Sequence, residues 1–308
     1  MAGAAFDASK AVLHGRFIAA AYTMYNQDPA NLTPQPSTDL PEGCKLTAWV
    51  QMQDFILDST DPVFYGFIAV RDENPNQAVL AIRGTSNGVE WWDDSNSLGL
   101  TAFKVPGYGN VGLGFARIYD TLEIVEHPPA AAAVAPNSLK QVGSFSAQVA
   151  AHLTRRARAA VSPQAVAPAP TIEVTGHSLG AALATYYAAE NALVHKIQNP
   201  ALYTFASPKV GDQTFVGAFN QLGLTSWRVV NKQDIVPHLP PLFSYHVDTE
   251  QLYDSDNRVQ PGFGCWHALA TYLHLIDSSL PLDAACQPKP PQAVAQQGFG
   301  VNSTDWAE

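Results

Sequence analysis

Hydrophobic residues recur along the chain at two spacings, one typical of helices and one typical of strands. A first amphipathic helix is predicted from apolar residues at helical spacing, namely Leu13, Phe17, Ala20, Ala21 and Met24. Two β-rich runs follow at residues 63–70 and 78–83, separated by a polar turn at 71–77. The first part of the chain is therefore predicted to contain one helix and a pair of neighbouring strands.

Strands and helices alternate in the rest of the pattern. Helical spacing predicts helices at residues 111–122, 138–159 and 179–192, and β-rich runs predict strands at 171–175, 201–206 and 227–231. The Pro- and Ala-rich breaks at 123–137 and 162–170 lie between these elements and do not separate two cores. We therefore predict an α/β fold in a single domain, residues 1–308, with a mostly parallel central sheet flanked by helices.

Composition and charge narrow the functional classes. The 308 residues carry a net charge of −10 and are 46% hydrophobic, which argues against disorder and against a nucleic-acid partner. No run reaches the roughly 18 apolar residues that a transmembrane helix requires. Asp7 precedes any cation and no small-residue cleavage site follows the first apolar segment, so no signal peptide is predicted within this chain. Secretion after removal of a leader is slightly favoured over a cytoplasmic location.

The three cysteines leave two interpretations open. Cys44, Cys265 and Cys286 contain no CxxC pair, which argues against a zinc site. Their spacing admits a Cys265–Cys286 disulfide with Cys44 free, and it equally admits three reduced thiols.

The clearest chemical signal is a G-x-S-x-G pentapeptide at residues 176–180. It follows a β-rich run and precedes an Ala-rich helical segment, the setting in which a tight turn exposes a serine hydroxyl. Ser178 is therefore the candidate nucleophile, and the backbone N–H of Leu179 would face the developing oxyanion.

A serine nucleophile needs a histidine base and a carboxylate that orients the base. In chain order the carboxylate follows the serine and the histidine comes last. Asp234 directly follows the strand at 227–231, at the edge of a parallel sheet where such sites assemble. The histidines that follow are His238, His246, His267 and His274. His267 is favoured because it stands at the junction between a loop and a helix, and His246 is the next candidate.

Other polar residues have simpler interpretations. Asp212 is expected to cap the helix that begins near residue 213, and Asp254 and Asp256 are expected to be solvated in a polar loop. The residues Gly84 and Thr85 leave the strand at 78–83, and the N–H of Thr85 is a candidate second oxyanion donor.

Five segments in this order resemble the fungal-type, or class 3, triacylglycerol lipases. They read AIRGT (81–85), GHSLG (176–180), TFASPKVGD (204–212), VNKQDIVPHLPP (230–241) and HALATYL (267–273). The resemblance implies an α/β-hydrolase fold and ester hydrolysis through an acyl-enzyme, with Ser178, Asp234 and His267 as the triad and Thr85 and Leu179 as oxyanion donors. It implies no metal and no organic cofactor. One departure is Gly112, which stands where the family usually has a histidine.

The resemblance also implies a lid at about residues 86–100. Trp91 and Trp92 lie in this segment and are expected to contact lipid, although burial in the core would also explain adjacent tryptophans. The expected substrate is an acylglycerol or other lipid ester at an oil–water interface. The alternatives are an esterase for short-chain or feruloyl-type esters, a phospholipase A1, and a non-catalytic lipid-binding relative.

Overall fold

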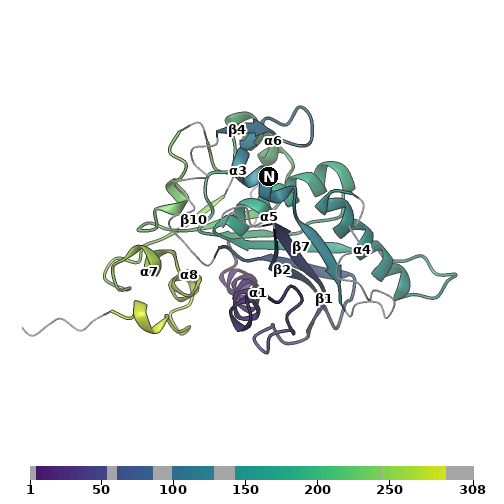
Figure 1. The fold of residues 1–308 in the computed structure, drawn as a ribbon, viewed down its shortest axis with the longest axis horizontal. Coiled ribbons are helices and arrows are strands. Elements are labelled where there is room, and N and C mark those ends of the chain that lie inside the picture. Colours follow the sequence, from purple (N-terminus) through teal and green to yellow (C-terminus); the bar gives the residue numbers. More distant parts are fainter. Residues whose placement is uncertain are drawn as a thin grey trace, which may run out of the picture.

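Eight strands form one twisted sheet through the centre of the molecule (Figure 1). This computed structural model describes residues 5–53, 61–85, 99–127, 143–242, 244–247 and 249–288. From edge to edge, the described strands are β10 (Glu250–Tyr253), β9 (Ser226–Asn231), β8 (Leu202–Phe205), β7 (Thr171–His177), β3 (Gln77–Ile82), β2 (Pro62–Arg71), β1 (Cys44–Gln53) and β6 (Glu123–Glu126). The structure thus has the predicted α/β architecture.

The sheet has a parallel part and an antiparallel part. Strands β3, β7, β8, β9 and β10 pair in parallel. Strands β2, β1 and β6 extend the sheet beyond β3 by antiparallel pairing. The carboxyl ends of the parallel strands lie on the same side of the sheet. The loops that follow these ends carry the polar residues considered below.

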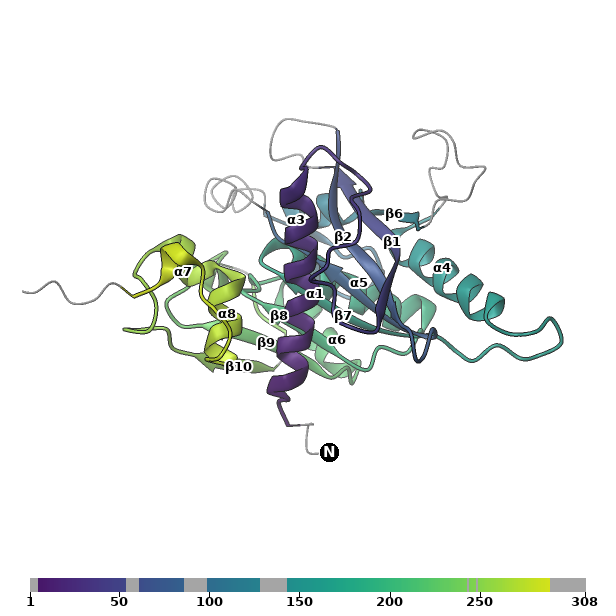
Figure 2. The same cartoon turned by 90° about the horizontal axis from the view of Figure 1, so that it is seen from below.

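Helices cover both faces of the sheet (Figure 2). One face packs against α3 (Leu113–Tyr119), α4 (Phe145–Ala159), α5 (Leu179–Glu190) and α6 (Gln213–Gln221). The other face packs against α1 (Ala8–Gln27) and α8 (Leu269–Ile276). Side chains of β3 alternate between the two cores, with Leu80 and Ile82 on the α5 side and Val79 and Ala81 on the α1 side. Because both faces are buried, this strand reads as a continuous apolar run.

Several elements differ from their predicted limits. The helix predicted from residue 138 begins at Phe145, because the side chain of Ser144 caps its first turn by accepting from the N–H of Ala147. Strand β6 occupies the start of the segment 123–137, which we interpreted as a connection. Strands β1 and β10 were not predicted, and the β-like run at 244–249 holds only a bridge at Tyr245 among its described residues.

The described residues also form several smaller elements. They are β4 (Leu100–Ala102), β5 (Asn110–Gly112), the π-helix η2 (Asn191–His195), α7 (Phe263–His267), and the 3-10 helices η3 (Val236–His238) and η4 (Ala284–Cys286). A disulfide joins Cys265 to Cys286, and Cys44 is a free thiol. Within the described ranges, no helix is long and apolar enough to span a membrane.

Candidate active site

Ser178 lies in a strained turn between β7 and α5. Its backbone has φ 57° and ψ −126°, a conformation that L-residues rarely adopt. The turn is compact because its flanking residues lack side chains: a Cβ at Gly176 would clash with the carbonyl of Gly180, and a Cβ at Gly180 with the carbonyl of Ile82. The two glycines of G-x-S-x-G therefore allow a geometry that places the Ser178 hydroxyl at the carboxyl ends of the parallel strands.

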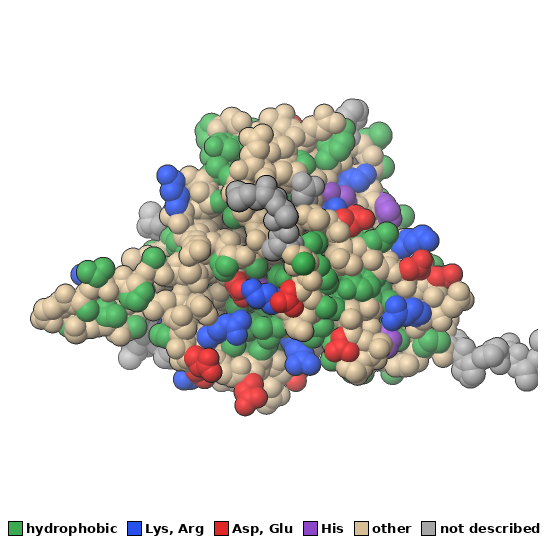
Figure 3. All heavy atoms as spheres, turned by 180° about the vertical axis from the view of Figure 1, so that it is seen from behind, with side chains coloured by type: hydrophobic (Ala, Val, Ile, Leu, Met, Phe, Trp, Pro, Cys, Tyr) green, Lys and Arg blue, Asp and Glu red, His purple; other side chains and the backbone are tan. Residues whose placement is uncertain are grey.

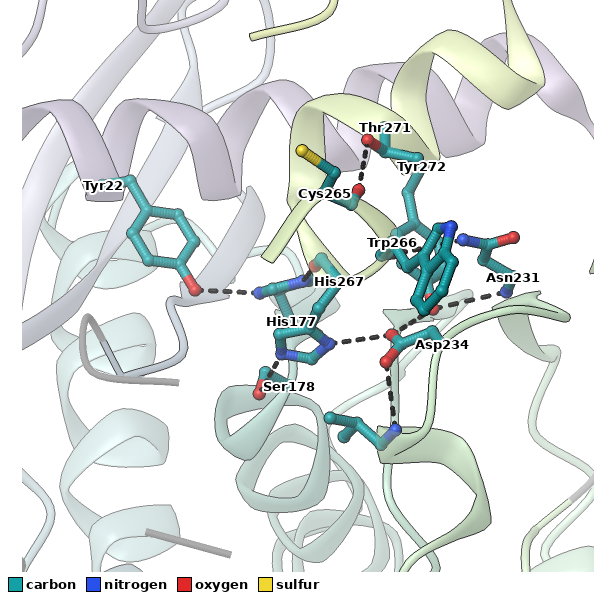
Figure 4. A network of polar contacts seen from close by, with 11 residues as sticks. Tyr22, His177, Ser178, Asn231, Asp234, Cys265, Trp266, His267, Thr271 and Tyr272 are labelled. Atoms are coloured by element: carbon teal, nitrogen blue, oxygen red, sulfur yellow. Dashed lines mark hydrogen bonds and ion pairs between the residues drawn. The ribbon is translucent and has the colours of Figure 1, made fainter. Parts of the chain in front are cut away.

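Ser178, His267 and Asp234 form a linear hydrogen-bonded array (Figure 4). The Oγ of Ser178 lies 2.9 Å from Nε2 of His267, and Nδ1 of His267 lies 2.8 Å from Oδ2 of Asp234. All three residues are buried. Because Asp234 can only accept when ionised, His267 donates from Nδ1, and its Nε2 is free to accept the serine proton. The array is therefore arranged for nucleophilic attack by serine.

Asp234 is held by two further donors. The hydroxyl of Tyr272 donates to Oδ2 at 2.7 Å, and the N–H of Val236 donates to Oδ1 at 3.0 Å. Burial and the adjacent charge of Asp234 raise the pKa of Tyr272 well above its ordinary value, so its hydroxyl stays protonated and keeps donating. These bonds compensate the cost of burying the carboxylate and fix the oxygen that faces His267.

The segment that carries His267 is fixed by contacts on both sides. Before it, the carbonyl of Cys265 accepts from Oγ1 of Thr271 at 2.6 Å. The carbonyl of Trp266 accepts from the side-chain amide of Asn231 at 2.9 Å. The carbonyl of His267 itself accepts from Nε2 of His177 at 2.9 Å. The base is thus held by both its side chain and its main chain.

His177 continues this network towards Tyr22 on α1. Since Nε2 of His177 donates to a carbonyl, its Nδ1 accepts from the Tyr22 hydroxyl, 2.8 Å away. The Tyr22 oxygen in turn accepts from the N–H of Gly84 at 2.8 Å. Burial, and secondly the nearby His267, lower the pKa of His177 well below its ordinary value. A neutral His177 therefore links the segment of His267 to the turn that contains Thr85.

The turn at Gly84 and Thr85 approaches the serine closely. A Cβ at Gly84 would lie 2.9 Å from Cβ of Ser178, so the approach requires glycine. The buried guanidinium of Arg83 donates to the carbonyls of Gly84 at 2.7 Å and Phe64 at 2.8 Å, which fixes the path of the turn. Leu179 is the first residue of α5, so its N–H has no partner within the helix.

The remaining sequence candidates lie elsewhere or have other partners. His246 donates to the carbonyl of Pro237, and His274 donates to the carbonyl of Leu280. Asp212 caps α6, as predicted. Asp254 contacts Lys232 and Gln233 in an exposed loop. None of these four side chains belongs to the array around Ser178.

Some features of the site were not predicted or cannot be placed. Sequence reasoning did not select Tyr22, Arg83, His177 or Tyr272 for a role, although Arg83 and His177 lie inside the motifs at 81–85 and 176–180. Trp91 and Trp92 lie outside the described residues, as does most of the lid predicted at 86–100. Among the side chains that are described, no group of three or more His, Cys, Asp or Glu could hold a metal ion.

A cavity of about 960 Å³ opens beside this array. Thr85 and His267 line it at one side, and α1 and α8 form much of its wall. Its volume is near the upper end of the roughly 300–1,000 Å³ typical of ligand pockets.

Comparisons with known proteins show which family the chain resembles. The family model for lipases of class 3 matches residues 79–244, which include Ser178 and Asp234. "Phospholipase A1-II 4" of Oryza sativa subsp. japonica is 30% identical over 241 residues, covering 71% of this chain and 57% of that protein. A lipase of Rhizomucor miehei is 37% identical over 110 residues, 34% of this chain and 30% of that protein. The chain spans about half the length of the curated relatives it matches.

The fold is also shared with solved structures of fungal lipases. The Rhizomucor miehei lipase propeptide complex superposes with a TM-score of 0.56 at 22% identity, covering 80% of this chain and 68% of that one. Lipase II from Rhizopus niveus gives a TM-score of 0.56 at 20% identity, with 80% of each chain covered. The match over residues 79–244 and the α/β-hydrolase architecture place this chain in the class 3 lipase family.

Proposed function

We propose that the protein is a carboxylic-ester hydrolase in which Ser178 is the nucleophile, His267 the base and Asp234 the residue that orients it. The observation that carries this proposal is the unbroken array from Asp234 through His267 to Ser178, with contacts of 2.8 and 2.9 Å. The strained backbone of Ser178 supports it, because strain of this kind is retained where it positions a reacting group.

The proposed reaction has two stages. In the first, Oγ of Ser178 attacks the ester carbonyl carbon while Nε2 of His267 takes the hydroxyl proton. The resulting oxyanion accepts from the N–H groups of Thr85 and Leu179. The carbon–oxygen bond to the alcohol then breaks, and His267 returns its proton to the leaving oxygen, which leaves an acyl-enzyme. In the second stage, water attacks the acyl carbon while Nε2 of His267 takes a proton from the water. The bond from the acyl carbon to Oγ of Ser178 then breaks, His267 returns the proton to Oγ, and the free acid departs.

The proposed substrates are acyl esters of glycerolipids, with triacylglycerols first among them. The net charge of −10 favours neutral lipid surfaces over anionic bilayers. On the face drawn in Figure 3, cationic and anionic side chains are interspersed and form no single basic patch. A second candidate, phospholipid hydrolysis, is favoured by a different observation, since several relatives are named as phospholipases A1.

Assays with an emulsified, a vesicular and a soluble ester distinguish these proposals. Purified protein is given emulsified triolein, phosphatidylcholine vesicles and soluble p-nitrophenyl acetate, each beside the Ser178→Ala variant. The triacylglycerol proposal expects Ser178-dependent release of fatty acid from triolein at a higher rate than from vesicles. A faster rate on vesicles would assign a phospholipase, and activity on the soluble ester alone would assign an esterase. No Ser178-dependent activity on any ester would contradict the hydrolase proposal and leave the lipid-binding alternative.

Two further proposals concern where the protein acts and how lipid reaches the site. The Cys265–Cys286 disulfide supports export to an oxidising compartment, because disulfides persist there and are rare in the cytosol. The lid at 86–100, with Trp91 and Trp92 as lipid contacts, is still a proposal from the sequence alone.

A further inference from the structure

A disulfide closes a covalent loop around the candidate base. It joins Cys265, which precedes His267 on α7, to Cys286, which lies 21 residues further along the chain. The loop contains His267 and also Tyr272, whose hydroxyl donates to Asp234. The disulfide therefore bounds the segment that supplies the base and one donor to the residue that orients the base.

Helix α7, which ends at His267, is too short to hold its own position. It has five residues, whereas isolated helices shorter than about 12–15 residues are marginal in water. It begins after Gly262, whose φ of 151° is rare for L-residues. It ends at Ala268, whose φ of −59° and ψ of 133° are not helical and separate α7 from α8. The position of α7 therefore depends on its contacts with other segments.

Neutral side chains hold the end of α7 that carries the base (Figure 4). The three hydrogen bonds described above run to main-chain carbonyls from Thr271, Asn231 and His177. Each such bond contributes modestly to stability, because water is a competing partner. The ring of Phe263 on α7 stacks on the imidazole of His267, with 5.6 Å between the centroids. A shift of α7 would therefore displace the imidazole as well.

A small apolar cluster joins α7 to the segment that follows α8. Its buried members are Val259, Leu282 and Cys286, with Cys265 packed against them. This cluster is separate from the larger cores on the two faces of the sheet. One backbone hydrogen bond, from the N–H of Gln260 to the carbonyl of Cys286 at 2.9 Å, lies beside it. Because so few side chains are buried here, the covalent bond is the strongest of these links.

We propose that the Cys265–Cys286 disulfide is a redox-controlled positioning device for His267. With the bond closed, α7 is tied to the segment after α8, and His267 stays aligned with Asp234 and Ser178. With the bond open, α7 shifts and the base loses the alignment on which proton transfer depends. The inference rests on the proposed function and adds a condition to it, since full activity would require a compartment in which disulfides form.

A dithiol is the chemical class of reductant that opens the bond. Cys265 is half-buried whereas Cys286 is 4% exposed, so the thiolate of the dithiol attacks Sγ of Cys265. The bond between the two cysteine sulfurs breaks, a mixed disulfide forms on Cys265, and Cys286 leaves as a thiolate. The second thiol then attacks the dithiol sulfur of the mixed disulfide and releases Cys265. Two electrons pass to the protein disulfide, the dithiol becomes a cyclic disulfide, and its two protons go to the cysteines.

Reversible reduction tests the device. Cys44→Ser is used, because reduction then exposes only Cys265 and Cys286 as thiols. The protein is treated with dithiothreitol and alkylated with iodoacetamide, and intact mass counts the alkylated cysteines. We expect kcat on p-nitrophenyl acetate to fall about 10- to 100-fold, with KM little changed, because the base and not the ester-binding groups is displaced. Re-oxidation with oxidised glutathione in place of alkylation should restore kcat.

The double variant Cys265→Ser and Cys286→Ser is the matched control for the reductant. It should be slow with and without dithiothreitol, whereas the unreduced Cys44→Ser protein should keep the wild-type rate. Circular dichroism and the melting temperature show whether each protein is folded in the assay. A reduced, folded protein with an unchanged kcat would overturn the proposal. A reduced protein that unfolds at the assay temperature would overturn it as well, since the bond would then serve overall stability.

A proton NMR measurement separates failure of this inference from failure of the proposed function. The Nδ1–H of a histidine that donates to a buried carboxylate resonates far downfield of the amide protons, and loss of the signal in Asp234→Asn assigns it to His267. We expect the signal in the oxidised protein and its loss after reduction. Because no substrate is needed, that loss would support the positioning role even where no ester is cleaved. An unchanged signal in the reduced, folded protein would overturn the role even in an active hydrolase.

Discussion

Nε2 of His177 lies 2.9 Å from the main-chain carbonyl oxygen of His267, so the residue before the candidate nucleophile holds the backbone of the candidate base. Through its other nitrogen, His177 contacts Tyr22, and Tyr22 accepts from the N–H of Gly84. The turn at Ser178, the segment of His267 and the turn at Gly84 and Thr85 are therefore connected by one chain of hydrogen bonds. Such a chain fixes the three parts relative to one another before a substrate arrives.

Tyr22→Phe should slow the reaction without changing the residues that react. The variant leaves Nδ1 of His177 and the N–H of Gly84 without their partner, which lets the turn at Gly84 and Thr85, the proposed oxyanion donor, move. We expect kcat on p-nitrophenyl butyrate to fall about tenfold, equivalent to about 1.4 kcal/mol in the barrier. The matched control is Tyr245→Phe, at an exposed tyrosine. An unchanged kcat in Tyr22→Phe would show that the Gly84 turn is held by other contacts.

Asp234→Asn should nearly abolish turnover. An amide at this position supports the wrong imidazole tautomer and removes the negative charge that stabilises a protonated His267, so kcat should fall by about 10⁴-fold. Asp254→Asn is the control, because Asp254 lies in an exposed loop away from the array. Steady-state hydrolysis of a soluble ester measures both. Comparable rates for Asp234→Asn and the wild type would mean that another carboxylate orients the base.

Tyr272→Phe removes a hydroxyl that donates to Asp234 and also accepts from the N–H of Asn231. Loss of the bond to Asp234 leaves the buried carboxylate with one donor fewer, which should cost about 1–3 kcal/mol of unfolding free energy. Urea denaturation of the wild type and the variant measures the difference. A variant as stable as the wild type would show that the carboxylate finds another donor.

The buried His177 predicts a pH dependence of stability. Burial, and then His267, keep the folded pKa of His177 well below its ordinary value, whereas the unfolded chain binds a proton below about pH 6.5. The unfolded state therefore binds more protons under acidic conditions, and stability is lost as the pH falls below about 6.5, by up to about 1.4 kcal/mol per pH unit. Above that pH, the contribution of the neutral His177 to the unfolding free energy is fully present.

His177→Gln removes this titration and so tests its sign. Urea denaturation at pH 8 and pH 5 gives the unfolding free energy of the wild type and of the variant. The excess is the unfolding free energy of the wild type minus that of the variant. We expect this excess to shrink by about 1–2 kcal/mol at pH 5. His152 and His246, whose pKa values are also lowered by burial, are present in both proteins and cancel in the comparison. An excess that is equal at both pH values would contradict a neutral, buried His177.

Site residues could be predicted from the sequence where their role requires particular neighbours along the chain. Ser178 was predicted because its strained turn requires glycines at fixed positions, and Asp234 because it follows a strand directly. His267 was favoured over His246 by its place between a loop and a helix, and the structure places it 2.9 Å from Ser178. The Cys265–Cys286 pair, left open by spacing, forms a disulfide.

Contacts between distant parts of the chain leave no local sequence pattern from which they could be predicted. Tyr22 meets His177 across 155 residues, and at the sequence level it is one more aromatic residue in an amphipathic helix. Strand β1 was missed because it mixes apolar and polar residues without alternation, and its polar Gln51 is satisfied by the distant carbonyl of Leu32. Strand β10 is short and half exposed at the sheet edge, where little apolar patterning is required.

Covalent labelling tests whether Ser178 is the nucleophile. Wild type and Ser178→Ala are incubated with a serine-directed alkyl fluorophosphonate, and intact mass and peptide mapping locate any adduct. We expect one adduct on Ser178, formed in step with loss of esterase activity, and no adduct in the variant. An active wild type that remains unlabelled, or that is labelled and inactivated at another residue, would contradict Ser178 as the nucleophile.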